Sequence, residues 1–209
     1  NLLTYNKSFG EHTLTVLLGQ EAYSTHYKNL SASKRGFAFN GLTEINSASE
    51  MNSMSSYYTQ YRLLSWLSRV EYDFNDRYYV SASFRTDGSS RFHPDNRWGN
   101  FWSVGASWRL SNEEFMKPYS TWLDNLKLKA SYGAVGNDNL GTYYAYQGLY
   151  ATGNNNYNDA GVFISRLPNK TLKWESNLQF NVGVDFAMFN KLSGSFEWFN
   201  RKSKDLLFT

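Results

Sequence analysis

Polar and apolar residues alternate through the middle of the chain, from residue 61 to residue 110. From Trp66 to Phe74, every second residue is apolar or small, and most of the residues between them are charged. The alternation restarts after the turn-favouring Asn75-Asp76-Arg77 and again after a loop at residues 88–99. Because successive side chains of a β-strand point to opposite faces, this period of two predicts strands with one apolar and one polar face.

Shorter alternating segments flank this central region. Strands are predicted there at residues 1–9, 13–23, 123–133, 174–188 and 192–202. Lys7 leaves the facing of the first segment open, because it would share a row with apolar residues, and Leu17 breaks the pattern of the second. The chain is therefore predicted to hold about eight antiparallel strands.

The connections between these strands are of two kinds. Residues 24–59 and 135–170 are rich in polar residues and glycine without a period, and they are predicted to be long loops, the first with a short helix near residues 49–53. The stretch from Ser111 to Glu114 fits a capping box and predicts one helical turn that Pro118 ends. Short and long connections alternate along the chain.

A soluble antiparallel sandwich and a transmembrane barrel both alternate in this way. Phe74 and Tyr78 flank a short turn, which is where the aromatic girdle of a membrane barrel lies. Segments of about ten residues suit a tilted strand that crosses the hydrocarbon. Short periplasmic turns opposite long extracellular loops are typical of outer-membrane barrels. The predicted fold class is therefore all-β, a portion of an antiparallel transmembrane β-barrel.

This fold places the two faces of each strand in different surroundings. The apolar rows are predicted to face lipid, and they comprise Trp66, Val70, Tyr72, Phe74, Tyr78, Val80, Phe84, Trp102, Val104, Trp108, Leu126, Leu128, Phe180, Val182, Val184 and Phe186. The charged residues of the opposite rows are predicted to line the lumen, and they comprise Arg69, Glu71, Asp73, Arg85, Arg109, Lys127 and Lys129.

The direction of the strands predicts that the chain is one part of a larger barrel. With the Gly10-Glu11 turn on the periplasmic side, the first strand begins outside the cell and the last strand ends there. A complete bacterial barrel begins and ends in the periplasm. Residues 1–209 are therefore expected to be part of a single, larger barrel domain.

Composition narrows the classes of function. Of the 209 residues, 18% are aromatic, and the mean hydropathy is -0.58, which suits a protein whose apolar surface is a thin band. The formal net charge of +3, without long Lys/Arg runs, gives no reason to expect a nucleic-acid partner. The chain has no cysteine, so neither a disulfide framework nor a thiolate metal site is predicted. No apolar run approaches the length of a transmembrane helix.

No catalytic site, metal site or cofactor is predicted. The histidines lie far apart and lack a metal-ligand spacing. Glu71, Asp73 and Asp87 could supply the acid pair of a glycosidase. In alternating strands they are better interpreted as lumen charges that neighbouring arginines balance, so the chain is predicted not to be an enzyme.

Aromatic residues also gather in the predicted loops. Candidates for contact with a ligand or with a protein lid are Trp98, Tyr143, Tyr144, Tyr146, Tyr150 and Tyr157. Such rings stack on sugars or pack against a partner, but they can equally form a small core of the loop itself. The pattern leaves both alternatives open.

Several stretches resemble the SusC/RagA branch of the TonB-dependent outer-membrane transporters. The most specific are Asp87-Gly88-Ser89-Ser90-Arg91-Phe92 and the run LKLKASYGAVGN that ends at Asn137. Residues 97–99 and 172–175 continue the pattern, and the resemblance spans nearly the whole chain. Trp102 departs from it, because the family more often has proline there.

The resemblance implies a plugged barrel of about 22 strands, of which residues 1–209 form a portion without the plug, the signal peptide and the remaining strands. It implies active import of oligosaccharides or peptides across the outer membrane of a Gram-negative, Bacteroidota-type bacterium. The expected partners are a SusD-like surface lipoprotein, outer-membrane lipid, and TonB through the absent plug. The competing interpretation is a soluble β-rich carbohydrate-binding module or glycosidase accessory domain, which would need a second sheet over the apolar rows.

Overall fold

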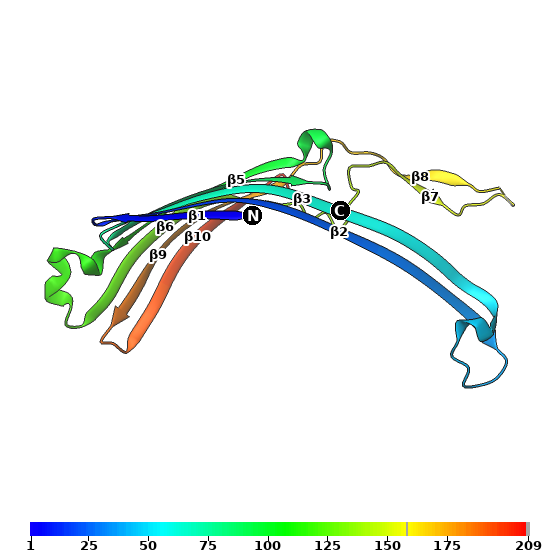
Figure 1. The fold of residues 1–209 in the computed structure, drawn as a ribbon, viewed down its shortest axis with the longest axis horizontal. Helices are drawn as coiled ribbons and strands as arrows, with labels where there is room; N and C mark the ends of the chain where they lie inside the picture. The colour runs from blue at the N-terminus through cyan, green and yellow to red at the C-terminus, as the bar shows by residue number, and fades with distance from the viewer. Residues whose placement is uncertain (158, 208–209) are drawn as a thin grey trace.

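A computed structural model describes residues 1–157 and 159–207. It consists mainly of one antiparallel sheet of eight strands, in the order β1-β2-β3-β4-β5-β6-β9-β10, with a separate two-stranded sheet (Figure 1). The large sheet comprises β1 (Leu2–Phe9), β2 (His12–Phe37), β3 (Ala48–Phe74), β4 (Tyr78–Ser89), β5 (Trp98–Arg109), β6 (Leu123–Asn137), β9 (Glu175–Met188) and β10 (Leu192–Lys204). The small sheet joins β7 (Leu149–Thr152) to β8 (Val162–Arg166). The predicted all-β antiparallel fold is confirmed.

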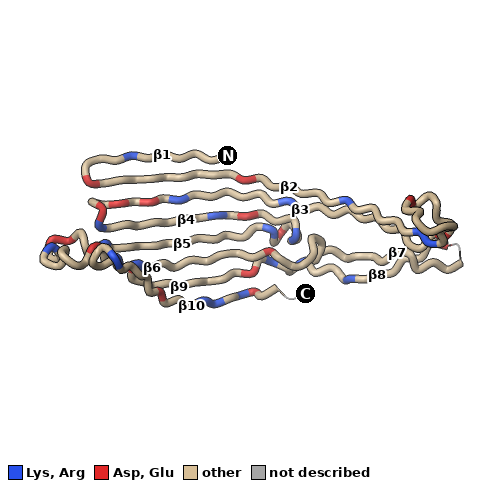
Figure 2. The backbone as a smooth tube through the Cα atoms, turned by 90° about the horizontal axis from the view of Figure 1, so that it is seen from below, with Lys and Arg blue, Asp and Glu red and all other residues tan. Residues whose placement is uncertain are grey.

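Tight turns join the strands at one end of the large sheet. Gly10, Asn75, Asp76 and Asn190 occupy these turns with φ between 51° and 61°. Gly, Asn and Asp adopt this left-handed conformation at the least cost, which is why the turns form there. The β5–β6 connection at the same end holds the 3-10 helices η3 (Leu110–Asn112) and η4 (Glu114–Tyr119). The β2–β3 and β7–β8 hairpins project from the opposite end (Figure 2).

The prediction of a long loop at residues 24–59 is wrong. Both β2 and β3 continue through most of it, with only η1 (Ile45–Ser47) and short flanking segments at the tip. The helix predicted near residues 49–53 is also wrong, because these residues belong to β3. Neither face of this hairpin is buried, so its strands need no apolar rows and carry no hydrophobic period.

The second predicted loop and the predicted capping box also differ from the structure. Strand β6 continues to Asn137, and the segment after it contains the β7–β8 hairpin. The N-cap residue of η4 is Glu113, whose side chain makes no capping bond, and Pro118 lies inside η4 instead of ending it. The Glu113 carboxylate instead accepts hydrogen bonds from the Tyr78 hydroxyl at 2.7 Å and from Nε1 of Trp108 at 2.9 Å.

The register sorts the side chains of the sheet into two faces, because paired residues on neighbouring antiparallel strands point the same way. One row runs through Tyr72, Val80, Ala106, Ala130, Val182 and Trp198, and the adjacent row runs through Glu71, Ser81, Gly105, Ser131, Asn181 and Phe199. We call the face of the first row the apolar face and that of the second row the polar face. All residues predicted to face lipid lie on the apolar face, and all predicted lumen residues lie on the polar face.

The same register settles the two residues that broke the pattern. Lys7 pairs with Leu14 and lies on the apolar face next to the first turn, where its exposed ammonium can reach water beyond the apolar rows. Leu17 pairs with Arg69 and lies on the polar face.

No second layer covers the apolar face within residues 1–157 and 159–207. Val80 and Val104, in the middle of this face, keep 52% and 48% of their surface exposed. The described residues therefore form no second sheet over the apolar rows, which the sandwich interpretation requires. In the same residues, no helix is long and apolar enough to cross a membrane.

Aromatic rings border the apolar face on two sides. Near the tight turns, neighbouring rings with centroids 4.8–6.3 Å apart run through Phe9, His12, Phe74, Tyr78 and Trp108. Toward the other end, rings with centroids 5.4–6.4 Å apart run through Trp102, Tyr132, Phe180 and Trp198. Aliphatic and alanine side chains lie between these two rows, an arrangement typical of the exterior of a membrane barrel.

Candidate functional site

Most of the buried side chains lie at the end of the sheet opposite the tight turns. This group, which we call the rim core, comprises Ser65, Asp87, Ser89, Phe92, Phe101, Ala134, Leu140 and Asn177. Trp174 packs against it, with ring centroids 5.5 Å from Phe92 and 5.2 Å from Phe101. Nε1 of Trp174 donates to the Arg97 carbonyl at 2.8 Å. The rim core thus joins β4, β5 and β6 to the segment before β9.

Two glycines make room for the rings of the rim core. A Cβ atom at Gly136 would collide with the Phe101 ring, and one at Gly99 would lie 2.5 Å from the same ring and 2.8 Å from Trp174. Any larger residue at these positions would displace an aromatic ring that few neighbours could accommodate.

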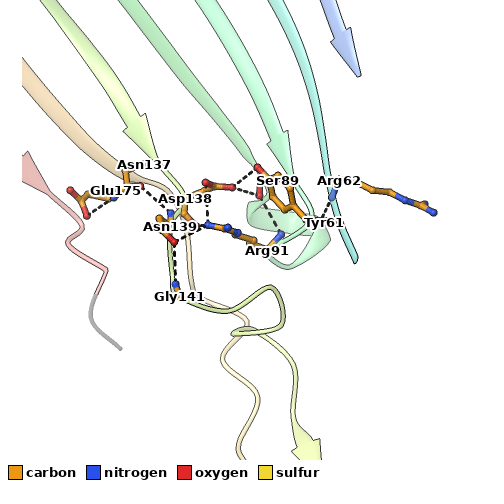
Figure 3. Close-up of polar contacts among 10 residues, drawn as sticks. Tyr61, Arg62, Ser89, Arg91, Asn137, Asp138, Asn139, Gly141 and Glu175 are labelled. Atoms are coloured by element: carbon orange, nitrogen blue, oxygen red, sulfur yellow. Dashed lines mark hydrogen bonds and ion pairs between the residues drawn. The ribbon is translucent and has the colours of Figure 1, made fainter. Parts of the chain in front are cut away.

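A single carboxylate ties the rim core to the loop that follows β6 (Figure 3). Oδ2 of Asp138 accepts hydrogen bonds from the Tyr61 hydroxyl at 2.9 Å and the Ser89 hydroxyl at 2.7 Å. Nη1 of Arg91 donates to the Asp138 carbonyl at 2.8 Å and forms an ion pair with Oδ1 at 3.5 Å. We call these four residues the Asp138 latch. They connect β3, the end of β4 and the loop at residues 138–148.

Aromatic rings cover the arginine of the latch. The Arg91 guanidinium lies 4.9 Å from the Tyr61 ring and 5.1 Å from the Tyr143 ring, and the two rings are stacked 5.5 Å apart. Tyr61 lies beyond the part of β3, from Trp66 to Phe74, that carries the apolar row. Burial, together with the bond to Asp138, raises the pKa of Tyr61 to about 12. The hydroxyl therefore stays protonated and donates to Asp138 at neutral pH.

The loop aromatics divide into two groups. Tyr143 stacks on Tyr61, the Tyr144 hydroxyl accepts a hydrogen bond from the Gln60 amide at 2.8 Å, and Tyr146 packs edge-on against His93 at 5.8 Å. These three rings form the loop's own contacts with the wall, which favours the second of the two alternatives that the sequence left open.

The remaining aromatic candidates are exposed. Tyr150 and Tyr157 keep 66% and 99% of their surface accessible, and Trp98 is about half exposed at the start of β5. Their contact with a ligand or lid stays a prediction.

The predicted lumen residues form several ion pairs within the wall. Arg85 bonds to Asp87 at 2.6 Å, and to Glu21 and Ser65 at 3.0 Å. Lys129 pairs with Asp185 at 2.9 Å and with Glu197 at 3.2 Å, and Arg69 pairs with Glu71. These partners, on strands from β2 to β10, neutralise charge locally and keep the face polar.

Two cations on this face lie against an aromatic ring. Nζ of Lys127 lies 4.6 Å, and the Arg109 guanidinium 5.5 Å, from the centre of the Tyr79 ring. Nε of Arg109 and Oδ2 of Asp73 are buried and have no hydrogen-bond partner among the described residues. Asp73 lines a hollow of about 490 Å³ on the polar face, together with Glu71, Tyr79, Lys127 and Lys129 among others. This surface can take further polar partners.

Sequence reasoning missed the rim core and the latch, although their residues stood in the most specific motifs. Four motif segments converge in space: Asp87 to Phe92, Arg97 to Gly99, Gly136-Asn137 and Trp174-Glu175. The side-chain amide of Asn137, for example, donates to the Glu175 carboxylate at 3.5 Å. The motifs themselves were the available signal. Alternation could not reveal this convergence, because it describes one strand at a time.

Comparisons with known proteins agree with this geometry. The family model described as TonB dependent receptor-like, beta-barrel matches residues 1–209. TonB-dependent receptor P3 of Formosa agariphila is 35% identical, over 100% of this chain and 21% of that protein. TonB-dependent receptor SusC of Bacteroides thetaiotaomicron is 33% identical, over 97% of this chain and 20% of that protein.

A solved structure of the RagAB peptide transporter superposes on this chain with a TM-score of 0.91 at 32% identity, covering 98% of this chain and 23% of that one. The chain spans about a fifth of the length of the curated relatives it matches. The full-length family match and these similarities show that the chain belongs to the TonB-dependent receptor β-barrel family.

Proposed function

We propose that this chain forms part of the wall and the extracellular rim of a TonB-dependent importer in the outer membrane of a Bacteroidota-type bacterium. The observation that carries the proposal is the single-layered sheet with one apolar face, edged by two aromatic rows, and one polar face. Lipid outside and a watery lumen inside satisfy both faces. The similarity to receptors of Formosa agariphila and Bacteroides thetaiotaomicron supports this location.

We infer that the complete importer takes up oligosaccharides or peptides together with a SusD-like lipoprotein, using energy delivered by TonB. The similarity to SusC and to the RagAB peptide transporter supports this cargo range and this kind of partner. The wall residues of this chain perform no covalent step in such a mechanism. Ion pairs such as Lys129–Asp185 keep the lumen wet, and Arg109 and Lys127 offer cations to the plug.

The import function is tested by deleting the gene for the full-length protein and measuring uptake of labelled oligosaccharides and peptides. We expect uptake of one cargo class to be lost, and to be lost equally when the TonB complex is inactivated. Unchanged uptake of both cargo classes in the deletion strain, with related receptors also deleted, would contradict the proposal.

The orientation is tested with epitope tags in the full-length protein. A tag in the exposed connection between β7 and β8, at residues 153–155, is expected to bind antibody on intact cells. A tag at Gly10-Glu11, in the first tight turn, is expected to bind only after the outer membrane is opened. The opposite result would reverse the assignment of the two ends.

A further inference from the structure

The outer part of the β2–β3 hairpin extends well beyond the other strands of the sheet (Figure 1). Strand β4 pairs with β3 only from Leu63 to Phe74. From Ala48 to Gln60, the side of β3 that faces away from β2 has no strand beside it in residues 1–157 and 159–207. We call this side the outer edge of β3. At a rise of about 3.3 Å per residue, it is roughly 40 Å long.

Contacts at the base of this edge establish which backbone groups point outward. The Gln60 amide donates to the Tyr144 hydroxyl at 2.8 Å, and the Arg62 carbonyl accepts from the Ser90 amide at 2.9 Å. In an antiparallel strand, the amide and carbonyl groups of every second residue point to the same side. Tyr58 and Ser56 therefore also present theirs to the outer edge, whereas Thr59 and Tyr57 turn theirs toward β2.

The outer edge lacks the features by which proteins normally block unwanted strand pairing, such as lysine and proline. Residues 53–60, SMSSYYTQ, contain no charged residue, no proline and no glycine. The paired stretch of β2 differs, because Lys28 lies opposite Tyr58 and Lys34 lies opposite Met51. One strand of the hairpin thus carries blocking lysines and the other does not.

The side chains that β3 itself places beside the outer edge, from Ser53 to Gln60, are neutral. Tyr57 lies against Tyr27, with tilted rings and centroids 5.6 Å apart, on the side that continues the polar face. The exposed Met54 and Tyr58 lie on the other side. The nearest acid on the strand, Glu50, is paired with Arg35 at 2.8 Å. Such a surface of hydroxyl groups, aromatic rings and one thioether complements an uncharged polypeptide segment.

We propose that the outer edge of β3 binds an extended, uncharged segment of the SusD-like lipoprotein, which adds to the hairpin as a further antiparallel or parallel strand. Strand addition uses unpaired backbone groups for affinity and flanking side chains for selectivity. The site lies beyond the apolar band, at the end of the sheet that the proposed function places outside the cell, where a surface lipoprotein can reach it. The inference rests on the proposed function, because that function places the edge outside the cell.

The test uses the full-length importer and its purified SusD-like lipoprotein. Ser56→Pro removes an amide that points to the outer edge and leaves the ladder with β2 intact, a position where an edge strand tolerates proline. Ser56→Ala is the matched control, because it removes the side chain but keeps the amide. We expect Ser56→Pro to raise the Kd for the lipoprotein by about tenfold or more, because one hydrogen bond is lost and the proline ring clashes with the added strand. Ser56→Ala is expected to change this Kd by less than about twofold.

Hydrogen exchange supplies the second readout. Adding the lipoprotein is expected to slow exchange at the Ser56 and Tyr58 amides, while Tyr57 and Thr59 stay protected in every variant, which shows that the hairpin is folded. Equal affinity of the two variants would overturn the inference. So would protection of Ser56 and Tyr58 without the lipoprotein, because another segment of the importer would then occupy the edge. If import and lipoprotein binding persist in Ser56→Pro, this inference fails and the proposed function stands.

Discussion

Asp138 holds together residues that lie far apart in the sequence. Its carboxylate and carbonyl accept bonds from Tyr61, Ser89 and Arg91, and its side chain is mostly buried. A buried donor that loses its only acceptor costs more than the bond itself contributed, because it has already given up water. Several contacts of the rim therefore depend on this one residue.

Replacing Asp138 with alanine is expected to release the loop at residues 138–148. The Tyr61 and Ser89 hydroxyls would lose their shared acceptor and Arg91 would lose its ion pair, at a cost of about 1–3 kcal/mol, while the bond from Arg91 to the backbone carbonyl of residue 138 would remain. Limited proteolysis of the full-length protein should then cut this loop roughly tenfold faster. Asp95→Ala, at an exposed position, is the control. Equal cleavage of both variants would mean that the latch does not hold the loop.

The raised pKa of Tyr61 predicts an alkaline transition at the rim. Because the folded pKa of about 12 exceeds the ordinary value near 10, the tyrosine's contribution to stability is complete below pH 10 and is lost as the pH rises through about 12. An ultraviolet titration of the wild type minus that of Tyr61→Phe should show one phenol that ionises near pH 12. A difference step near pH 10 would contradict the burial of this hydroxyl.

Connections between elements depend on side chains as well as on backbone turns. Glu113, in the β5–β6 connection, bonds to Tyr78 of β4 and Trp108 of β5, and its carboxylate lies 3.5 Å from Arg77. It therefore joins a turn to the aromatic row that borders the apolar face. Because its carboxylate bonds to Tyr78 and Trp108, Glu113 stabilises the connection between the strands, in place of the capping box that the sequence predicted.

Glu113 is expected to make this end of the sheet sensitive to acid. Hydrogen bonds from Tyr78 and Trp108, and the charge of Arg77, lower the pKa of Glu113. Its contribution is thus present above the ordinary glutamate pKa and is lost as the pH falls through the lower, folded value. The Tm of the wild type should fall in this acidic range, and the fall should be smaller in Glu113→Gln. Glu44→Gln, at an exposed position on the tip of the β2–β3 hairpin, is the control and should behave like the wild type.

The large sheet is a single layer, and in the proposed function it separates lipid on its apolar face from water on its polar face. Neighbouring residues of one strand can therefore meet different solvents, as Val80 on the apolar face and Ser81 on the polar face do. If both faces of the sheet were in water, introducing a charge would cost about the same at either position.

Placing one arginine on each face distinguishes the two possibilities. Val80→Arg puts a charge into the middle of the apolar band, where lipid would impose about 2–4 kcal/mol, whereas Ser81→Arg puts it beside Glu71 on the polar face. The amount of heat-resistant, folded protein in the outer membrane should fall for Val80→Arg and stay near the wild-type level for Ser81→Arg. Equal amounts would argue against lipid on the apolar face.

Local sequence patterns were enough to predict the strands from Trp66 to Arg109, the facing of their side chains and the positions of the tight turns. These features depend on a period of two and on residues that accept positive φ, which are both local properties. The outer hairpin escaped prediction because strands wet on both faces need no apolar period. The rim core and the latch could not be predicted in this way, because they depend on tertiary contacts: the Tyr61–Asp138 bond joins residues 77 positions apart. Such contacts form only after the sheet has brought its strands into register.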